Sequence, residues 1–314
     1  MLVARYGELS LLAALMLSGC GSTETVDLLP NGAAGNSHSG GSDAKGGITG
    51  QAGSAVSGGA NGGSAGNPTA PSTSTTPRLP SLPNELIHLY DFSGSGTEIT
   101  DLGGGTSGEV KGGSTLNGQG QLEISDGVSY VRLPSWLLSK SGTASITIAT
   151  WVTWNGGLSW PRLFDFGATQ EGLDAPGTAI SQFYFTPKFE PLKFYSAVLA
   201  YDTTQGGQAS VEGTEAFPIG VQTFVAVVVV GDTAANTSTL HVYVNGVEAG
   251  TEASTTLTLT SFSDPHCWLG QSQWVQDADP SQHFKGSFDE FRIYNRALSA
   301  TEIQALVLSD STKL

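Results

Sequence analysis

The chain has 314 residues, and its 28 acidic side chains outnumber its 13 basic ones, which gives a formal net charge of −15 at neutral pH. A chain this acidic repels the phosphate backbone of a nucleic acid, so we expect no nucleic-acid partner. Its length allows one large domain with a sizeable core in addition to segments that do not fold.

The first predicted element is an apolar run over residues 9–17, LSLLAALML. It is much shorter than the roughly 20 residues that cross a bilayer as a helix, and it is typical of the hydrophobic region of a signal peptide. The residues Leu17-Ser18-Gly19-Cys20 resemble the lipobox of bacterial lipoproteins, in which the cysteine is acylated and becomes the new N-terminus. The alternative is an ordinary secretory signal peptide with an incidental cysteine.

The lipobox resemblance implies that residues 1–19 are removed and that acyl chains on Cys20 anchor the protein in a membrane. Gly21, in place of an aspartate, implies transport to the outer membrane of a Gram-negative cell. We therefore expect a lipid-anchored protein of the bacterial cell envelope, in the outer membrane or at the cell surface. An acylated Cys20 leaves Cys267 without a disulfide partner, and we expect Cys267 to be a small buried residue.

Residues 20–83 form the second predicted segment. From residue 31 to residue 67 they are mainly glycine, serine, alanine and asparagine, with Ile48 and Val56 as the sizeable apolar side chains. Such a segment buries too little apolar surface to offset the entropy lost on ordering. The prolines that follow favour an extended chain. The composition predicts a disordered stalk that holds a domain away from the membrane.

Residues 84–314 predict one all-β domain. Apolar and polar residues alternate in segments rich in β-branched and aromatic side chains, and glycine, proline and asparagine separate these segments. One helix is predicted, Ser299 to Leu308, with Ser299 and Glu302 as a capping box. These elements predict a two-sheet antiparallel β-sandwich with a short C-terminal helix. The predicted strands are residues 86–92, 121–124, 130–133, 145–154, 162–167, 180–186, 193–201, 223–231, 239–246, 266–271 and 287–295.

Several motifs in this domain resemble one known family. Asn245-Gly246 lies between two alternating runs, and this dipeptide favours a tight hairpin. The order YDF, SITIATWV, TLHVYVNGVEAG and GSFDEFRIYNRALSATEIQAL is similar to that of laminin-G-like, concanavalin A-like lectin/glucanase domains. The resemblance covers residues 84–308 and implies a jelly-roll sandwich.

The last predicted strand carries a candidate metal ligand. Strict alternation places Asp289 on the same face as Phe291 and Ile293, toward the core. A carboxylate there needs backbone donors, a cation or Arg296 as its partner. Related sandwiches often hold a structural Ca²⁺ near this edge, so the resemblance implies a calcium site formed by Asp289 and by Asp101 in the glycine-rich loop after the first strand.

The same fold hosts glycosidases, which usually need two carboxylates ~5–10 Å apart. Enzymes of this fold tend to supply them from one strand as Glu-x-Asp-x-x-Glu or Glu-x-Asp-x-Glu, and neither pattern occurs in this chain. Asp289 and Glu290 are adjacent, so on a regular strand they point to opposite faces. We therefore predict that the domain has no catalytic residues and is not an enzyme.

Two loop tryptophans are the candidate ligand contacts. Exposed aromatic rings stack on the apolar faces of sugars, while aspartate, asparagine and glutamine side chains bond the sugar hydroxyls. Trp160 lies in NGGLSWPR and Trp274 in GQSQWVQDADPSQ, among glycine and polar residues. The polar contacts expected beside Trp274 are Gln273, Asp277 and Asp279. The alternative is that both rings cap the ends of the sandwich core.

Two functions remain open from the sequence. The first is a monomeric, non-catalytic glycan-binding module that the lipid and the stalk display at the cell surface. The second is a structural or protein-interaction domain of the same fold without a sugar site, whose partner is an envelope or extracellular protein. Both are compatible with the fold, because one fold hosts many functions.

Overall fold

The computed structural model describes a folded domain from residue 85 to residue 310. The ranges outside the described residues are 1–84, 173–174, 191–193, 202–207, 275–282 and 311–314. The predicted signal peptide, the predicted stalk and the candidate residues Cys20, Asp277 and Asp279 all fall on these ranges. In the described part, no helix is both long enough and apolar enough to cross a bilayer.

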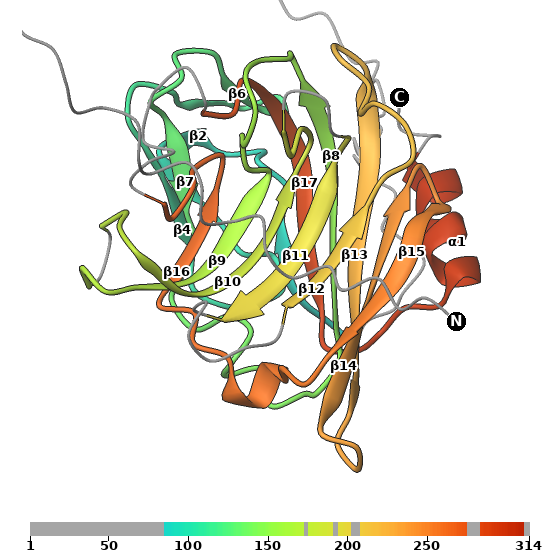
Figure 1. The fold of residues 1–314 in the computed structure, drawn as a ribbon. Coiled ribbons are helices and arrows are strands. Elements are labelled where there is room, and N and C mark those ends of the chain that lie inside the picture. Colours follow the sequence, from blue (N-terminus) through green and yellow to red (C-terminus); the bar gives the residue numbers. More distant parts are fainter. Residues whose placement is uncertain (1–84, 173–174, 191–193, 202–207, 275–282, 311–314) are drawn as a thin grey trace, which may run out of the picture. The chain divides into compact units, whose positions relative to one another are not determined.

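Two antiparallel β-sheets pack against each other and form the domain (Figure 1). The first sheet has the strand order β1-β17-β8-β13-β14-β15, and β6 also pairs with β17. Its strands are β1 (Leu86–Tyr90), β6 (Leu122–Ile124), β8 (Ile146–Trp154), β13 (Gln222–Asp232), β14 (Thr237–Val244), β15 (Val247–Thr255) and β17 (Gly286–Tyr294).

The second sheet has the strand order β12-β11-β10-β9-β16-β7-β4-β3. Its strands are β3 (Glu98–Ile99), β4 (Gly108–Lys111), β7 (Tyr130–Arg132), β9 (Phe164–Thr169), β10 (Ala179–Thr186), β11 (Ser196–Tyr201), β12 (Gln208–Glu212) and β16 (His266–Leu269). The remaining elements are the paired short strands β2 (Ser95–Gly96) and β5 (Leu116–Asn117), the 3-10 turn η1 (Leu259–Ser261) and the helix α1 (Ala300–Asp310).

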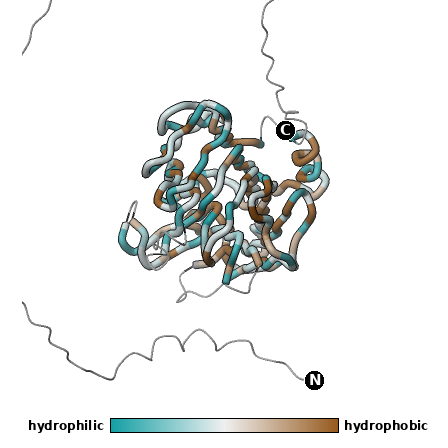
Figure 2. The backbone as a smooth tube through the Cα atoms, turned by 90° about the horizontal axis from the view of Figure 1, so that it is seen from above, coloured by the Kyte–Doolittle hydropathy of each residue, from teal (hydrophilic) through white to brown (hydrophobic). Residues whose placement is uncertain are grey.

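The main core lies between the two sheets. Successive residues of a strand point to opposite faces, so each strand supplies alternate apolar side chains to this core. Hydrophobic and hydrophilic residues accordingly alternate along the tube in Figure 2. In the second sheet, Phe164 and Phe166 of β9 and Phe183 and Phe185 of β10 point inward, and Cys267 is buried with them, as predicted.

The sequence prediction of a sandwich is confirmed, and each predicted strand overlaps a strand of the structure. The predicted hairpin is confirmed as well. Asn245 and Gly246 join β14 to β15 with φ angles of 50° and 80°. Positive φ at both central residues is what a tight two-residue hairpin of type I′ requires. The strands β2, β3, β4, β5 and β12 were not predicted, and β15 was predicted only as the second run of the hairpin.

Helix α1 covers the outer face of the first sheet, and Figure 1 shows it beside β15. Ile303 and Leu306 of the helix pack against a buried cluster on that face that includes Trp151. The predicted capping box is present: Glu302 accepts from the backbone N–H of Ser299 at 2.9 Å, and the Ser299 hydroxyl accepts from the N–H of Glu302 at 3.3 Å. Two orphan N–H groups at the helix start are thereby satisfied.

The prediction that side chains alternate strictly along the last strand is wrong at one position. The register between β17 and β8 shifts between Phe288 and Glu290, which is a β-bulge. A bulge adds one residue to a strand and reverses its alternation, so Phe288 packs in the main core together with Phe291, although alternation placed them on opposite faces. Asp289 is the residue at this bulge and is half-buried.

Candidate binding face

The outer face of the second sheet is the candidate binding face. Helix α1 occupies the corresponding face of the first sheet, whereas no helix in the described part of the chain covers this one. Because Phe164, Phe166, Phe183 and Phe185 point into the core, their neighbours in β9 and β10 point outward. The outward side chains include Asp165 of β9, Gln182 and Tyr184 of β10, and His266 and Trp268 of β16, and Tyr184 packs there against Val198 and Ala200 of β11.

A buried ion pair lies at the centre of this face. The Nε of Arg162 is 3.2 Å from Oδ2 of Asp165, and both side chains are almost completely removed from solvent. The guanidinium carbon of Arg162 lies 4.1 Å from the ring centre of Tyr184, which is a close cation–π contact. A carboxylate and a guanidinium can be buried together at this point because each supplies the partner that the other needs.

The loop that carries Trp274 is bonded to the same carboxylate. Gln273 donates from its backbone N–H to Asp165 at 3.0 Å and from its side-chain amide at 2.6 Å. Trp274 then lies over β10, where its indole N–H donates to the side chain of Gln182 at 2.8 Å. Gly167 leaves the room for this approach, because a Cβ at that position would collide with the Gln273 amide and with the carbonyl of Ser181.

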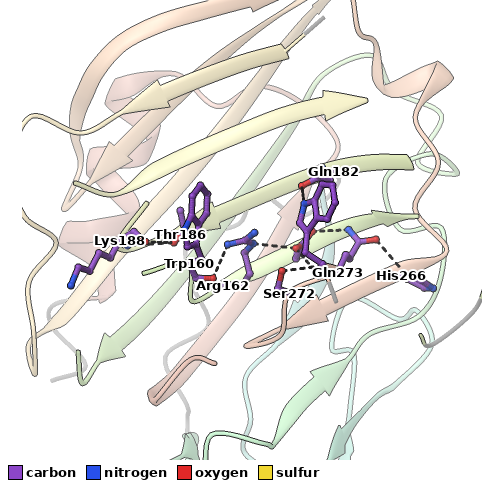
Figure 3. A network of polar contacts seen from close by, with 10 residues as sticks. Trp160, Arg162, Gln182, Thr186, Lys188, His266, Ser272 and Gln273 are labelled. Carbon is purple, nitrogen blue, oxygen red and sulfur yellow. Dashed lines mark hydrogen bonds and ion pairs between the residues drawn. The ribbon is translucent and has the colours of Figure 1, made fainter. Parts of the chain in front are cut away.

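The loop that carries Trp160 is bonded to the other side of the ion pair. Arg162 donates from Nη1 to the carbonyl of Trp160 at 2.7 Å, and the Trp160 N–H donates to the carbonyl of Lys188 at 2.7 Å. The Trp160 ring lies 4.5 Å from the ring of Phe189 and 5.7 Å from the Arg162 guanidinium. Figure 3 shows Trp160, Arg162 and Gln273 as parts of one network. The two tryptophans, which come from loops more than a hundred positions apart in the sequence numbering, therefore belong to one connected structure.

The network continues toward β16. One ring nitrogen of His266 lies 3.3 Å from Oε1 of Gln273, and the other lies 2.7 Å from the carbonyl of Gly172. The His266 ring stacks on Trp268 at 4.5 Å, and Tyr130 meets Trp268 edge-on at 5.9 Å. Trp268 is fully buried, but it lies outside the core between the sheets.

The predicted ligand contacts differ in their placement. Trp160 and Trp274 are both partly exposed, so neither ring is sealed inside the core. Gln273 was expected to reach a ligand, but it is completely buried and its amide is bonded within the protein. Gln273 therefore positions the Trp274 loop. Asp277 and Asp279 fall outside the described residues.

Sequence reasoning missed Arg162, Asp165, Gln182, Tyr184 and His266. One local signal for Asp165 was present in RLFDFG, because a charged residue between two inward-facing phenylalanines must point to the other face of the strand. Its pairing with Gln273 depends on the strand order β9-β16, which brings together residues far apart in the chain. No local pattern could have shown that contact.

The surroundings of Asp101, one of the two predicted calcium ligands, do not match those of a calcium site. Its Oδ1 accepts from the N–H groups of Leu89 and Gly103, both at 2.9 Å. Its Oδ2 accepts from the N–H of Gly105 at 3.1 Å and lies 2.6 Å from Nδ1 of His88. A carboxylate offers about four lone-pair sites, and nitrogen groups occupy them here, whereas Ca²⁺ needs six to eight oxygen ligands. The residues around Asp101 do not fit this ion.

Asp289 has a different environment. Gln121 donates from Nε2 to its Oδ1 at 3.1 Å, while Arg296, one of the three partners considered from the sequence, pairs with Glu85 and Glu302. Among the residues that the structure describes, no group of three or more histidine, cysteine, aspartate and glutamate side chains is arranged to hold a metal ion. Calcium in this protein stays a prediction, which elemental analysis of the purified chain would test.

Burial changes the acidity of Asp165. Loss of hydration raises its pKa to about 6, and the Arg162 charge and the Gln273 hydrogen bonds offset part of this rise. Between its ordinary value of 3.8 and about 6, the folded protein holds a proton on Asp165 that the unfolded chain has released. The contribution of this group to stability is therefore largest below pH 4, falls as the pH rises to 6, and is constant above that pH.

We predict that the pH dependence of the unfolding free energy shows the titration of Asp165. The unfolding free energy of the wild-type chain minus that of Asp165→Asn should fall by up to about 3 kcal/mol between pH 4 and pH 7. Urea unfolding of both chains across this range measures the difference, and the other carboxylates cancel in it. A difference that stays flat over the range would show that Asp165 does not titrate there.

Comparison with known proteins shows the superfamily of this chain. It belongs to the concanavalin A-like lectin/glucanases superfamily, whose family model matches residues 125–304. No curated protein matches the sequence.

Solved structures with the same fold include domain 4 of the extracellular arabinanase AbnA of Geobacillus stearothermophilus, solved with arabinotriose. Its identity to this chain is 22%, the match covers 71% of this chain and 98% of that one, and the TM-score is 0.53. The binding domain of botulinum neurotoxin DC, solved with rat synaptotagmin II, is 16% identical, with 73% and 52% covered and a TM-score of 0.50. At these identities the likeness shows the fold alone.

Proposed function

We propose that this chain is a non-catalytic glycan-binding protein and that it binds glycans on the outer face of the second sheet. The observation that carries the proposal is that Trp160 and Trp274 lie on the same face and are joined through Arg162, Asp165 and Gln273. Rigidly held, partly exposed indole rings offer apolar platforms for sugar rings without further loss of side-chain freedom. The likeness to a domain solved with arabinotriose makes arabinan a reasonable first glycan to test.

A binding role fits this face better than hydrolysis. A glycosidase needs a proton donor and a second carboxylate that reach opposite sides of one glycosidic bond. The network between the two tryptophans supplies Asp165, which is fully buried and bonded to Arg162 and Gln273. A carboxylate held in this way supports the site from below instead of contacting the sugar.

We predict that each platform contributes strongly to affinity. Replacing Trp160 or Trp274 by alanine should weaken glycan binding at least tenfold, and replacing both should abolish it, because aromatic anchors dominate binding energies of this kind. The full chain and its variants would be compared on a glycan array that includes arabinan. Their unfolding free energies would be measured in parallel, so that lost affinity is separated from lost stability.

Trp136 provides the matched control. It is also a partly exposed loop tryptophan with a positive φ, 69°, and it also has a cation over its ring, the Lys140 ammonium at 5.5 Å. It lies in the loop after β7 and has no part in the network. Trp136→Ala should leave glycan binding unchanged. Equal losses in all three alanine variants would contradict the assignment of this face.

The second part of the proposal concerns location. A diacylglycerol on Cys20 anchors the chain in the cell envelope, and residues 21–83 act as a tether that gives the domain reach. Incorporation of labelled palmitate by the wild-type chain, with none in Cys20→Ala, would support the anchor, and equal labelling would exclude it. If the folded chain binds no glycan on the array, a protein-interaction role becomes the better account of the fold.

A further inference from the structure

We propose that His266 holds the Trp274 loop in place through a contact that depends on pH. When both ring nitrogens of His266 carry a proton, the ring joins Gln273 to the segment that follows β9. Loss of one of these protons weakens the junction and loosens the loop. The contact acts in the protein without any ligand, so it does not depend on the proposed glycan binding.

His266 is a buried residue although it lies on the outer face of the second sheet. It is 1% exposed, and its ring stacks on the indole of Trp268 with ring centres 4.5 Å apart and planes that differ by 9°. A cation over the face of an indole is attracted to it, most strongly where water is excluded. The stack therefore favours the protonated ring, whereas burial by itself favours the neutral one.

Both ring nitrogens of His266 face oxygen atoms. Nε2 lies 2.7 Å from the carbonyl oxygen of Gly172, and Nδ1 lies 3.3 Å from Oε1 of Gln273, as Figure 3 shows for the second contact. Neither oxygen has a hydrogen to donate, so each contact needs a proton on the histidine. A neutral imidazole has one N–H group and a protonated imidazole has two. Only the protonated ring therefore makes both hydrogen bonds.

The amide of Gln273 cannot turn over to suit a neutral histidine. Its nitrogen donates to Oδ1 of Asp165 at 2.6 Å, and a turned amide would place its oxygen against that carboxyl group. Burial raises the pKa of Asp165 to about 6, but a protonated carboxyl keeps an oxygen that accepts, so this amide orientation suits both of its forms. A neutral His266 then has a nitrogen lone pair opposite the Gln273 oxygen in a site closed to water, which costs free energy.

Other ionisable groups lie on the elements packed around His266. Asp165 is paired with Arg162, Arg132 with Glu109 at 3.0 Å, and the Glu171 carboxylate accepts from the N–H of Thr178 at 2.9 Å. Among the described residues, these groups are Asp165 of β9 with Arg162 before it, Glu171 after β9, Tyr130 and Arg132 of β7, and Asp264 before β16, which is bonded to the N–H groups of Leu138 and Ser139. The titration of Asp165 near pH 6 is the one that must be separated from that of His266.

The His266 contact is the part of the loop attachment that changes with the charge of a histidine. Gly177 donates from its backbone N–H to the carbonyl of Gln273 at 2.7 Å, and the Trp274 indole donates to Gln182 at 2.8 Å. Neither of these bonds contains a group that titrates near neutral pH. His266 is therefore a positioning residue whose hold on Gln273, and through it on Trp274, is strong below the ordinary histidine pKa of about 6.5 and weaker above it.

The test is a pH titration of the ¹⁵N-labelled full chain without ligand, followed by NMR from pH 5 to pH 8.5. The ring nitrogen signals of His266 count its protons directly. We expect two ring protons at pH 5 and loss of the Nδ1 proton as the pH rises. Over the same range, the exchange rate of the Trp274 indole N–H, divided by that of a free indole at the same pH, should rise at least fivefold.

Two variants separate His266 from Asp165. His266→Gln keeps Asp165 and supplies an amide that donates at every pH, so the pH response of Trp274 should disappear. His241→Gln is the matched control, because His241 pairs with Glu248 at 2.8 Å on the first sheet, and this variant should keep the response. A response that persists in His266→Gln would assign it to Asp165 and overturn the proposal. A wild-type ring with the same number of protons from pH 5 to pH 8.5 would also overturn it, whether or not the variant folds.

Discussion

Asp165→Ala is expected to lower the unfolding free energy at pH 7.5 by about 3–5 kcal/mol, because it leaves the buried Arg162 guanidinium without its carboxylate. The same substitution removes both acceptors that hold the backbone and side chain of Gln273. The Trp274 loop should therefore lose its position as well. Urea unfolding followed by tryptophan fluorescence measures the first effect, and glycan affinity measures the second.

Two control variants sharpen this experiment. Asp165→Asn keeps the shape and one acceptor, so its loss should be smaller than that of the alanine variant. The double variant Arg162→Leu, Asp165→Leu removes both charges, and its loss should be much smaller than the sum of the single losses, because a buried pair is costly mainly when one partner is left alone. Simple additivity of the two single variants would contradict the ion pair as described.

Asp310→Ala is expected to cost about 2–3 kcal/mol, because Asp310 connects the end of α1 to the first sheet. Its Oδ2 lies 2.8 Å from Nη1 of the buried Arg292 and accepts from the indole N–H of Trp151 at 3.1 Å. A carboxylate at a helix C-terminus is unfavourable for the helix dipole, so the pairing must outweigh this penalty. The loss is smaller than for Asp165, since Arg292 keeps its contact with Glu290.

Hydrogen exchange can measure how firmly α1 is attached to the first sheet. Hydrogen exchange of the backbone N–H groups of α1 should accelerate in Asp310→Ala before the strands are affected. Asp310→Asn, which keeps an oxygen for Trp151 but loses the charge, should fall between the wild type and the alanine variant. Wild-type stability in Asp310→Ala would show that the helix is held by its apolar face alone.

The sequence predicted the parts of the fold in which alternation and burial coincide. β13, which is mostly buried, and the hairpin at Asn245-Gly246 are clear examples. The short strands β3, β4 and β12 were missed because each has only two to five residues, some of them exposed and polar, and gains its stability from neighbours in the sheet. The bulge at Asp289 was missed because an inserted residue leaves no mark in composition.

Of the described residues of the candidate site, the sequence predicted the two partly exposed tryptophans but not most of the buried residues that join them. Trp160 and Trp274 could be found because large aromatic rings among glycine and polar residues are unusual in loops. The residues that join them could not be found in the same way. The Arg162 guanidinium contacts the Tyr184 ring of β10, and Gln273 donates to Asp165 of β9. Both contacts form only when the strands have paired, so no local sequence pattern predicts them.

The measurement that tests the central claim most directly is a titration of the full chain with arabinotriose, or with the glycan that the array selects, followed by the indole N–H signals of its six tryptophans in NMR spectra. Binding on the proposed face should shift the signals of Trp160 and Trp274. The signals of Trp151 and Trp154, which belong to the first sheet, should stay in place. Shifts confined to Trp151 and Trp154 at saturating glycan would contradict the account.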